Sequence, residues 1–305
     1  MPKRLQVLTR AVVSVAFIIL LAAQALVAQN VLTGTWTASA DPEKPGRLSL
    51  SLERRAADGG KNQIGQTYDL ADLQGLSREQ AAGTGAVRFS LVREAGRIDC
   101  EGSFLNGKGS GTFSFNGSQG FVSAMRSRGF DFEPDPAQPK GRRDAEERLF
   151  AAAALDVTTA LADDLLSAGF GKLVVEDLIK AKIFKVDSNY AREMRGLGFP
   201  GLNMEELVKA RIFKIDTEAV RRAARMGFVR EPLEGLVKIQ IFKVTPEFVA
   251  EARNEGLTNL SVEEFVKLRI FKIDADFIRR AKAEGVPVEV ETLVQRRIGE
   301  RRRAR

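Results

Sequence analysis

The phrase Ile-Phe-Lys returns four times in the C-terminal half of the chain, and it constrains the fold more than any other feature. The four copies begin at Ile183, Ile212, Ile241 and Ile270, a constant step of 29 residues. A constant step of this size is typical of one supersecondary unit that has been copied and stacked on itself. The sequence therefore predicts an array of helical repeats, to which we assign residues 144–298.

Each repeat is predicted to be a pair of short antiparallel helices. The first helix starts at a capping box, as at Asn203 with Glu206, where side chains satisfy free amide groups at the helix start. The second helix has an N-cap and a terminating glycine at matching places in each unit: Asp187, Asp216, Thr245 and Asp274, then Gly198, Gly227, Gly256 and Gly285. Helices of about ten residues are marginal alone in water, so the units must stack.

The apolar and the charged positions of the phrase are expected to have separate roles. The Ile and Phe of each copy are predicted to lie between neighbouring hairpins, where burial of each side chain contributes roughly 1.5–3 kcal/mol. One lysine series is expected to pair with the glutamate four residues before it, and the other to complement the carbonyl groups at the helix end. The two series are Lys180, Lys209, Lys238 and Lys267, and Lys185, Lys214, Lys243 and Lys272.

Positions at which the units differ are the candidates for specific recognition. A stack of repeats displays a long surface on which side chains vary while the backbone frame stays constant, and binding another protein is a common use of such a surface. One varying position directly precedes the Ile-Phe-Lys phrase. Its residues are the predicted partner-binding residues: Lys182, Arg211, Gln240 and Arg269.

Residues 30–130 are predicted to form an antiparallel β domain, either a small sheet or a partial barrel. Apolar residues alternate with polar ones, as in Leu48, Leu50 and Leu52, which is typical of strands with one buried face. About six strands are expected, including a three-strand meander over residues 86–116 with a hairpin turn at Asn106-Gly107. The predicted fold class is therefore α+β, a β domain followed by an α-solenoid-like array.

Two short features of the β domain extend this prediction. Cys100 alternates with Ile98 and is predicted to be a buried structural residue rather than a reactive thiol. The domain is expected to end in a short helix that repeats the spacing of a second helix of the array. The matching residues are Phe121, Met125 and Phe130 in the β domain, and Tyr190, Met194 and Phe199 in the first repeat.

Both ends of the chain carry segments outside these domains. Residues 1–25 combine basic residues with an apolar run and predict a signal peptide cleaved after Ala25, with an uncleaved signal anchor as the alternative. Residues 131–143 are predicted to be an extended proline-rich linker, and residues 299–305 a basic tail. The candidate contacts of this end with anionic polymers or phospholipid headgroups are Arg296, Arg297, Arg301, Arg302, Arg303 and Arg305.

The composition excludes several kinds of site. The 305 residues include no histidine and one cysteine, which excludes histidine-dependent catalysis, the usual zinc sites and an intramolecular disulfide. No cofactor or metal is predicted, and the chain is predicted not to be an enzyme; a carboxylate pair of the glycosidase kind is the catalytic alternative. The net charge of +7 lies at the two ends of the chain, and nucleic acid is not expected as a partner.

The phrase Leu-Val-Lys-x-Arg-Ile-Phe-Lys-Ile-Asp, with Arg-x-x-Gly-Phe following, resembles helical repeats of exported bacterial proteins of unknown role. It is also similar to repeats appended to membrane-bound metallopeptidases of the antirepressor type. The resemblance covers residues 158–298 and implies an accessory array in the cell envelope without the peptidase, because the His-Glu-x-x-His motif is absent. We expect an exported, periplasmic or extracellular protein whose array binds another envelope protein; the alternative is a small-molecule or lipid carrier with the β domain as its cup.

Overall fold

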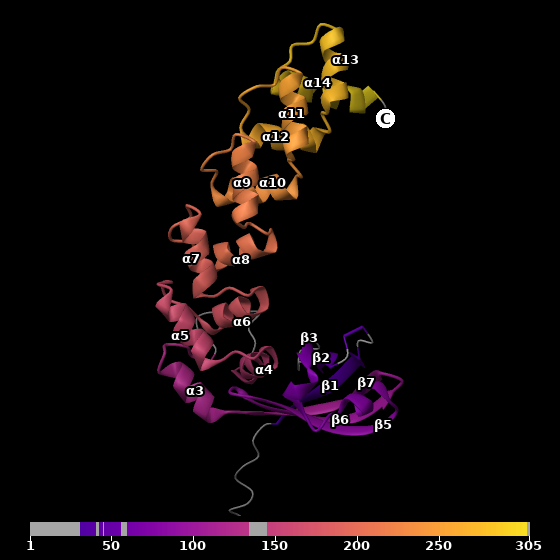
Figure 1. Cartoon of the computed structure of the whole chain (residues 1–305), viewed down its shortest axis with the longest axis vertical. Coiled ribbons are helices and arrows are strands. Elements are labelled where there is room, and N and C mark those ends of the chain that lie inside the picture. Colours follow the sequence, from indigo (N-terminus) through magenta and orange to yellow (C-terminus); the bar gives the residue numbers. More distant parts are fainter. Residues whose placement is uncertain (1–30, 41–42, 45, 56–59, 134–144, 304–305) are drawn as a thin grey trace, which may run out of the picture. The chain divides into compact units, whose positions relative to one another are not determined.

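The fold is α+β, as the sequence predicts (Figure 1). The computed structural model describes residues 31–40, 43–44, 46–55, 60–133 and 145–303, with the backbone alone for 301–303. The chain divides into two compact units: one holds the residues up to Ser123 together with Phe132–Asp156, and the other holds Ala124–Asp131 and the residues from Val157 onward. The predicted signal segment 1–25, most of the predicted linker 131–143 and Arg305 lie outside the described residues.

The first unit contains a curled antiparallel sheet of seven strands in the order β3-β2-β1-β7-β6-β5-β4. The predicted meander over residues 86–116 is confirmed as β5–β6–β7, while the predicted total of about six strands is one short. Between β3 and β5 the chain also forms the turn η1 (Leu70–Asp72) and the helix α2 (Arg78–Ala82). The strands are β1 (Leu32–Ala40), β2 (Arg47–Arg55), β3 (Lys61–Asp69), β4 (Leu73–Gln74), β5 (Gly85–Arg93), β6 (Gly96–Leu105) and β7 (Lys108–Gly117).

Helix α4 (Ala145–Leu155) packs on the inner face of this sheet. It contacts β3 as well as β5, β6 and β7, and since β3 and β5 lie near opposite ends of the strand order, the sheet curls around the helix. The Phe150 ring stacks on Phe113 at 5.2 Å between centroids, and the Tyr68 hydroxyl donates a hydrogen bond of 2.7 Å to the carbonyl oxygen of Ala154. Helix α4 therefore belongs to the β unit, and its assignment to the array was wrong.

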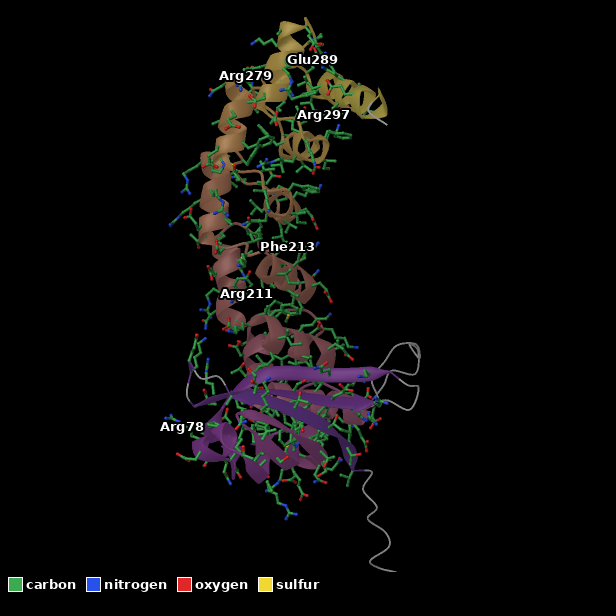
Figure 2. The ribbon with its side chains drawn as sticks, turned by 90° about the vertical axis from the view of Figure 1, so that its right-hand side faces the viewer. Arg78, Arg211, Phe213, Arg279, Glu289 and Arg297 are labelled. Atoms are coloured by element: carbon green, nitrogen blue, oxygen red, sulfur yellow. The ribbon has the colours of Figure 1, made fainter. Side chains whose placement is uncertain are left out.

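The second unit is a stack of helical hairpins. Within it the first helices of the repeats lie side by side, as α6 with α8 and α10 with α12, while the second helices contact one another, as α5 with α7 and α11 with α13. Figure 2 shows the second helices following one another in a column beside the stacked first helices. The helices are α5 (Thr159–Ser167), α6 (Val175–Phe184), α7 (Ser188–Gly196), α8 (Met204–Ile212), α9 (Thr217–Arg225), α10 (Leu233–Ile241), α11 (Pro246–Asn254), α12 (Val262–Phe271), α13 (Ala275–Ala283) and α14 (Val290–Arg303).

The predicted helix caps are confirmed. The Asn203 side chain accepts a hydrogen bond from the Glu206 backbone amide, and the Glu206 side chain accepts one from the Asn203 backbone amide. Asp216 caps the following helix by accepting from the Ala219 amide at 2.8 Å. The second helices end at glycines with positive φ, for example 92° at Gly227, a conformation that side chains with a Cβ rarely adopt.

The predicted copy of a second helix at residues 118–130 has the local geometry of a repeat. Helix α3 (Gln119–Arg126) is followed by a hydrogen bond of 3.0 Å from the Phe130 amide to the Met125 carbonyl. In the first repeat the Phe199 amide bonds the Met194 carbonyl at 3.1 Å in the same way. Ala124–Asp131 groups with the helical unit rather than with the sheet, and the chain returns to the β unit at Phe132.

Candidate functional site

The isoleucines of the repeated phrase face solvent, and the prediction that they lie between hairpins was wrong. Their exposed fractions are 51% at Ile183, 52% at Ile212, 49% at Ile241 and 49% at Ile270. The phenylalanines beside them are partly exposed. Isolated exposed apolar residues are ordinary, but one at the same place in four successive units makes a regular series. We call this surface the ridge: Ile183, Phe184, Ile212, Phe213, Ile241, Phe242, Ile270 and Phe271.

The helix geometry explains why these isoleucines are exposed. Ile212 follows Lys209 by three residues and Glu205 by seven, so all three share the outer stripe of α8. The buried apolar position comes after the turn that ends the helix, where Ile215 is 1% exposed. The same holds in the repeat formed by α12 and α13, where Ile273 is 1% exposed. The isoleucine that starts the phrase is therefore half exposed, while the apolar residue that follows its lysine is buried.

The lysine that ends each phrase occupies a left-handed backbone position. Its φ is 55° at Lys185, 52° at Lys214, 52° at Lys243 and 56° at Lys272. The next residue then bonds the last turn of the helix, as in the 2.8 Å bond from the Ile215 amide to the Ala210 carbonyl. Glycine is the usual residue at this position, yet all four first helices of the full repeats end on lysine. The prediction that these lysines lie at helix ends is confirmed.

These helix-end lysines differ from the other lysine series in their partners. They are exposed, and in the part of the chain that the structure describes none of the four has an ion pair. Each member of the other series bridges to the next unit; the glutamate four residues earlier on the same helix adds a charge interaction, as Glu234 does for Lys238. The bridges are Lys180–Glu205, Lys209–Glu234, Lys238–Glu263 and Lys267–Glu291.

The bridges shift the titration of their members. The hydrogen bond from Lys209 lowers the pKa of the Glu234 carboxyl. The hydrogen bond to Glu263 raises the pKa of Lys238 in the following unit. The positive charges of this series are therefore neutralised within the array, and the helix-end lysines carry the uncompensated charge beside the ridge.

Two of the varying positions proposed for partner recognition, Arg211 and Arg269, contact the preceding unit. The Arg211 guanidinium lies 3.5 Å above the centre of the Tyr190 ring, and that of Arg269 lies 4.0 Å above Phe248. Arg269 also donates two hydrogen bonds, of 2.6 and 3.0 Å, to the Lys243 carbonyl. A guanidinium held over an aromatic face and bonded to a free helix-end carbonyl stabilises the joint between units.

Of the remaining two positions, Gln240 fits the same explanation. In the unit that carries Gln240 in place of the arginine, the aromatic ring is also replaced, by Ala219. The arginine and the ring therefore change together along the array. Lys182 lies on α6, where it is partly exposed. The binding of a partner by Lys182, Arg211, Gln240 and Arg269 stays a prediction, and the aromatic contacts give two of them a role inside the array.

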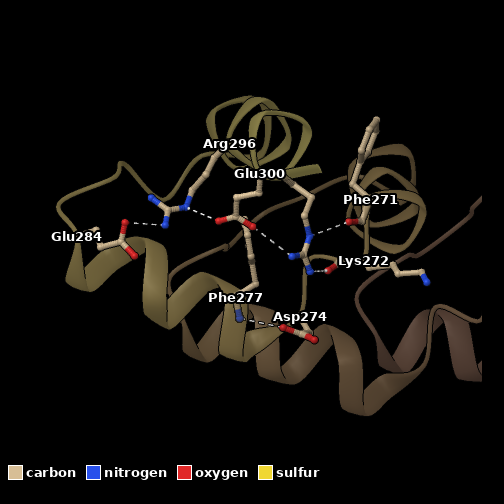
Figure 3. A network of polar contacts seen from close by, with 8 residues as sticks. Phe271, Lys272, Asp274, Phe277, Glu284, Arg296 and Glu300 are labelled. Atoms are coloured by element: carbon tan, nitrogen blue, oxygen red, sulfur yellow. Dashed lines mark hydrogen bonds and ion pairs between the residues drawn. The ribbon is translucent and has the colours of Figure 1, made fainter. Parts of the chain in front are cut away.

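Two arginines assigned to the basic tail belong to the end of the array (Figure 3). Arg297 lies 4.3 Å above the Phe277 ring and donates to the Phe271 and Lys272 carbonyls at 3.2 and 2.5 Å, as Arg269 does one unit earlier. Arg296 donates to Glu284 at 2.7 Å and ion-pairs with Glu300 at 3.3 Å. Helix α14 continues to Arg303, so the predicted tail 299–305 begins as helix.

The described residues offer little for catalysis. They contain no group of three or more His, Cys, Asp or Glu that could hold a metal ion. The buried carboxylate Glu147 is engaged by Arg54 at 2.7 Å and by the Asn62 amide at 3.1 Å. Cys100 is 2% exposed, as predicted, and burial raises the pKa of its thiol to about 12. A thiol with so high a pKa is a poor nucleophile at neutral pH.

The inner face of the sheet is not an open cup. Helix α4 covers it, and Ala151, Ala152, Ala153 and Ala154 are fully buried there. A hollow of about 220 Å³ remains beside Leu32, Phe115 and Leu149, which is below the few hundred Å³ of ordinary ligand pockets. Larger hollows, of about 500 and 700 Å³, lie along the loops of the array, and an open one of about 580 Å³ lies over β1, β2 and β3 beside Ser39, Ser49 and Thr67. This arrangement does not favour the carrier alternative.

No family model, curated protein or solved structure matches this chain. None of the described helices is long and apolar enough to cross a membrane. The ridge is the functional candidate that sequence reasoning missed. A lysine does not reveal a left-handed helix end, so the only signal that the sequence offered was the recurrence of the whole phrase every 29 residues.

Proposed function

We propose that this chain is an exported binding protein without catalytic activity, and that the ridge of its helical array docks another protein. The repeats then supply a rigid row of apolar contacts, and the β unit is a separately packed domain. The resemblance of the repeats to those of exported bacterial proteins agrees with this proposal. Export itself rests on the predicted signal segment 1–25.

The observation that carries the proposal is the regular exposure of isoleucine, near one half at Ile183, Ile212, Ile241 and Ile270. Exposed branched side chains in a row, rimmed by charges, are typical of protein interaction surfaces. Covering the exposed half of each isoleucine contributes about 1 kcal/mol by transfer free energies. The four together contribute about 4 kcal/mol, so specific docking requires further contacts from the partner.

The proposal is tested by crosslinking and recovery of the full chain from its native envelope. The natural protein is compared with a variant in which the four ridge isoleucines are changed to serine. We expect the natural protein to recover a specific partner and the variant to lose it. Recovery of the same partner in equal amount by both would disprove the ridge as the docking surface.

A matched control removes an exposed apolar side chain outside the ridge. Val229 is 70% exposed and lies in a loop of the same array, so Val229→Ser changes the surface polarity without touching the ridge. This variant is expected to recover the partner as the natural protein does. Equal thermal unfolding of all three proteins would show that the losses come from the surface and not from the fold.

A further inference from the structure

We infer that the partner contributes an acidic amphipathic α-helix, with an apolar side chain at every seventh position, which lies along the ridge. This inference rests on the proposed function, because it names the chemistry of the segment that the ridge would hold. It is carried by the unpaired charge beside each isoleucine, the step between units, and the glutamates on the same outer stripe.

The charge beside the ridge is positive in every unit. Lys214, for example, is exposed and without an ion pair among the described residues, two residues after Ile212. The nearest carboxylate in sequence, Asp216, is turned to its own helix start, where it accepts from the Ala219 amide. A partner that places carboxylates opposite these lysines would gain a favourable interaction at each step.

The lysines at the helix ends have a conformational cost, and they supply a positive charge that complements the helix-end carbonyls and is open to a partner. An L-residue in the left-handed conformation is disfavoured relative to glycine. The chain places glycine at the ends of its second helices, as at Gly227, and lysine at the ends of its first helices, as at Lys214. The cap would be satisfied by either residue, so the side chain of the lysine is the feature that glycine could not supply.

The step between units matches a helix that runs across them. Packed helices lie about 8–10 Å apart, so successive ridge isoleucines are expected at about that spacing. Seven residues of α-helix rise about 10.5 Å and return to the same face. An extended strand covers the distance in about three residues, but its side chains then alternate between faces. Four ridge positions correspond to a partner helix of about 22 residues.

The surroundings of the ridge favour a narrow partner over a flat or a like-charged one. The outer stripe of the first helices also carries glutamates, with side-chain exposure of 69% at Glu205 and 61% at Glu234. A planar anionic membrane would approach these carboxylates together with the isoleucines, whereas a single helix, about 10–12 Å wide, covers less of the outer stripe. A second copy of this chain would bring lysine against lysine.

The inference is tested by selection from a display library of random 28-residue peptides against the immobilised full chain. The expected result is enrichment of acidic, helix-forming peptides with apolar residues seven positions apart. Their binding should fall at least tenfold when the four ridge isoleucines are changed to serine. It should also fall, and lose most of its dependence on salt, when Lys185, Lys214, Lys243 and Lys272 are changed to asparagine, which tolerates the left-handed position.

The outcomes separate this inference from the proposed function. Peptides that are neutral or basic, or that lack the seven-residue period, but still depend on the isoleucines would overturn the inference and leave the docking surface standing. No isoleucine-dependent peptide of any kind would overturn both. A control variant changes four exposed cations on the second helices to glutamine: Arg192, Arg221, Arg280 and Lys282. If the peptides bind this variant as well as the natural protein, the role of the ridge lysines is supported.

Two further measurements test whether a lipid surface or a second copy of this chain occupies the ridge instead. Vesicles containing phosphatidylglycerol are sedimented with the full chain, and binding that depends on the ridge isoleucines while no peptide is enriched would overturn the helical partner in favour of a lipid surface. Sedimentation of the chain alone reports self-association. A dimer that dissociates when the ridge isoleucines become serine would overturn the inference in favour of a second copy.

Discussion

The two lysine series of the array lie on the same helices but have opposite surroundings. Lys209 bridges to Glu234 of the next unit, while Lys214, five residues later, extends from a left-handed helix end without an ion pair among the described residues. Both series recur in every unit, so recurrence alone does not distinguish them. The difference teaches that a constant residue in a repeat serves either the joint between units or a surface that all units share.

The apolar positions make the same contrast within one phrase. Ile273 is buried in the joint, and Ile270, three residues earlier, is half exposed on the ridge. The residues that vary between units, such as Arg211 and Arg269, contact rings inside the array. In this array the constant positions therefore include the exposed surface, and the varying positions include internal contacts.

The largest expected effect separates the two isoleucines of one unit. Ile273→Ala is expected to lower the free energy of unfolding by about 2–5 kcal/mol, because it removes buried methyl groups and leaves a cavity. Ile270→Ala is expected to lower it by about 1 kcal/mol, because only half of the side chain is removed from water. Urea unfolding followed by circular dichroism measures both. Equal costs at the two positions would contradict the exposed ridge.

The next effect concerns the arginine and aromatic pairs. A double-mutant cycle on Arg269→Gln and Phe248→Ala is expected to give a coupling of about 0.5–2 kcal/mol in the free energy of unfolding. The matched positions Gln240 and Ala219 lack both groups. Introducing an arginine at 240 and a phenylalanine at 219 together is expected to raise the free energy of unfolding, and either substitution alone is not. If the two substitutions of the Arg269 cycle lower the free energy of unfolding independently, the explanation that Arg269 and the Phe248 ring stabilise the joint together is wrong.

A smaller effect compares the two kinds of helix end. Lys214→Gly is expected to raise the free energy of unfolding by up to about 1 kcal/mol, because glycine adopts the left-handed conformation without strain. Gly227→Lys is expected to lower it, since a Cβ there would lie 3.0 Å from the Arg253 guanidinium. Thermal unfolding measures both changes. A loss of stability in Lys214→Gly would mean that the lysine supports the fold itself.

Much of the fold could be predicted from the sequence because it depends on local signals. The hairpin turn at Asn106-Gly107, the capping box at Asn203 and the glycines that end the second helices each act over a few residues. The partner of Lys209 could not be predicted in this way, because Glu205 on the same helix and Glu234 in the next unit have equivalent positions in the repeat. Only the stacking of the units decides between them.

The position of α4 and the exposure of the ridge depend on packing over longer distances. The alanine-rich segment Ala151–Ala154 has the composition of a packed helix, but nothing in it names the sheet as its neighbour. Ile212 and Ile215 are the same residue type at three residues' separation. The left-handed turn at Lys214 decides which of them enters the joint, and a lysine gives no sequence signal of that conformation.

The smallest expected effect tests the bridges between units by their titration. The pKa of the Glu234 carboxyl is lowered by the hydrogen bond from Lys209, so the stabilisation is present above the ordinary glutamate pKa and is lost as the pH falls through the lowered value. In Lys209→Gln the pKa of Glu234 should return toward its ordinary value, as measured by NMR titration. A Glu234 pKa that does not move would contradict the bridge.

The measurement that tests the ridge most directly is the rate at which a cysteine placed on it reacts with a thiol reagent. The chain's own Cys100 is buried, so Ile212→Cys and the buried control Ile215→Cys can be compared without interference. In the purified protein we expect fast labelling at position 212 and slow labelling at position 215. In the native envelope we expect the docked partner to slow labelling at position 212 several-fold; equally fast labelling there in both settings would contradict a ridge that holds a partner.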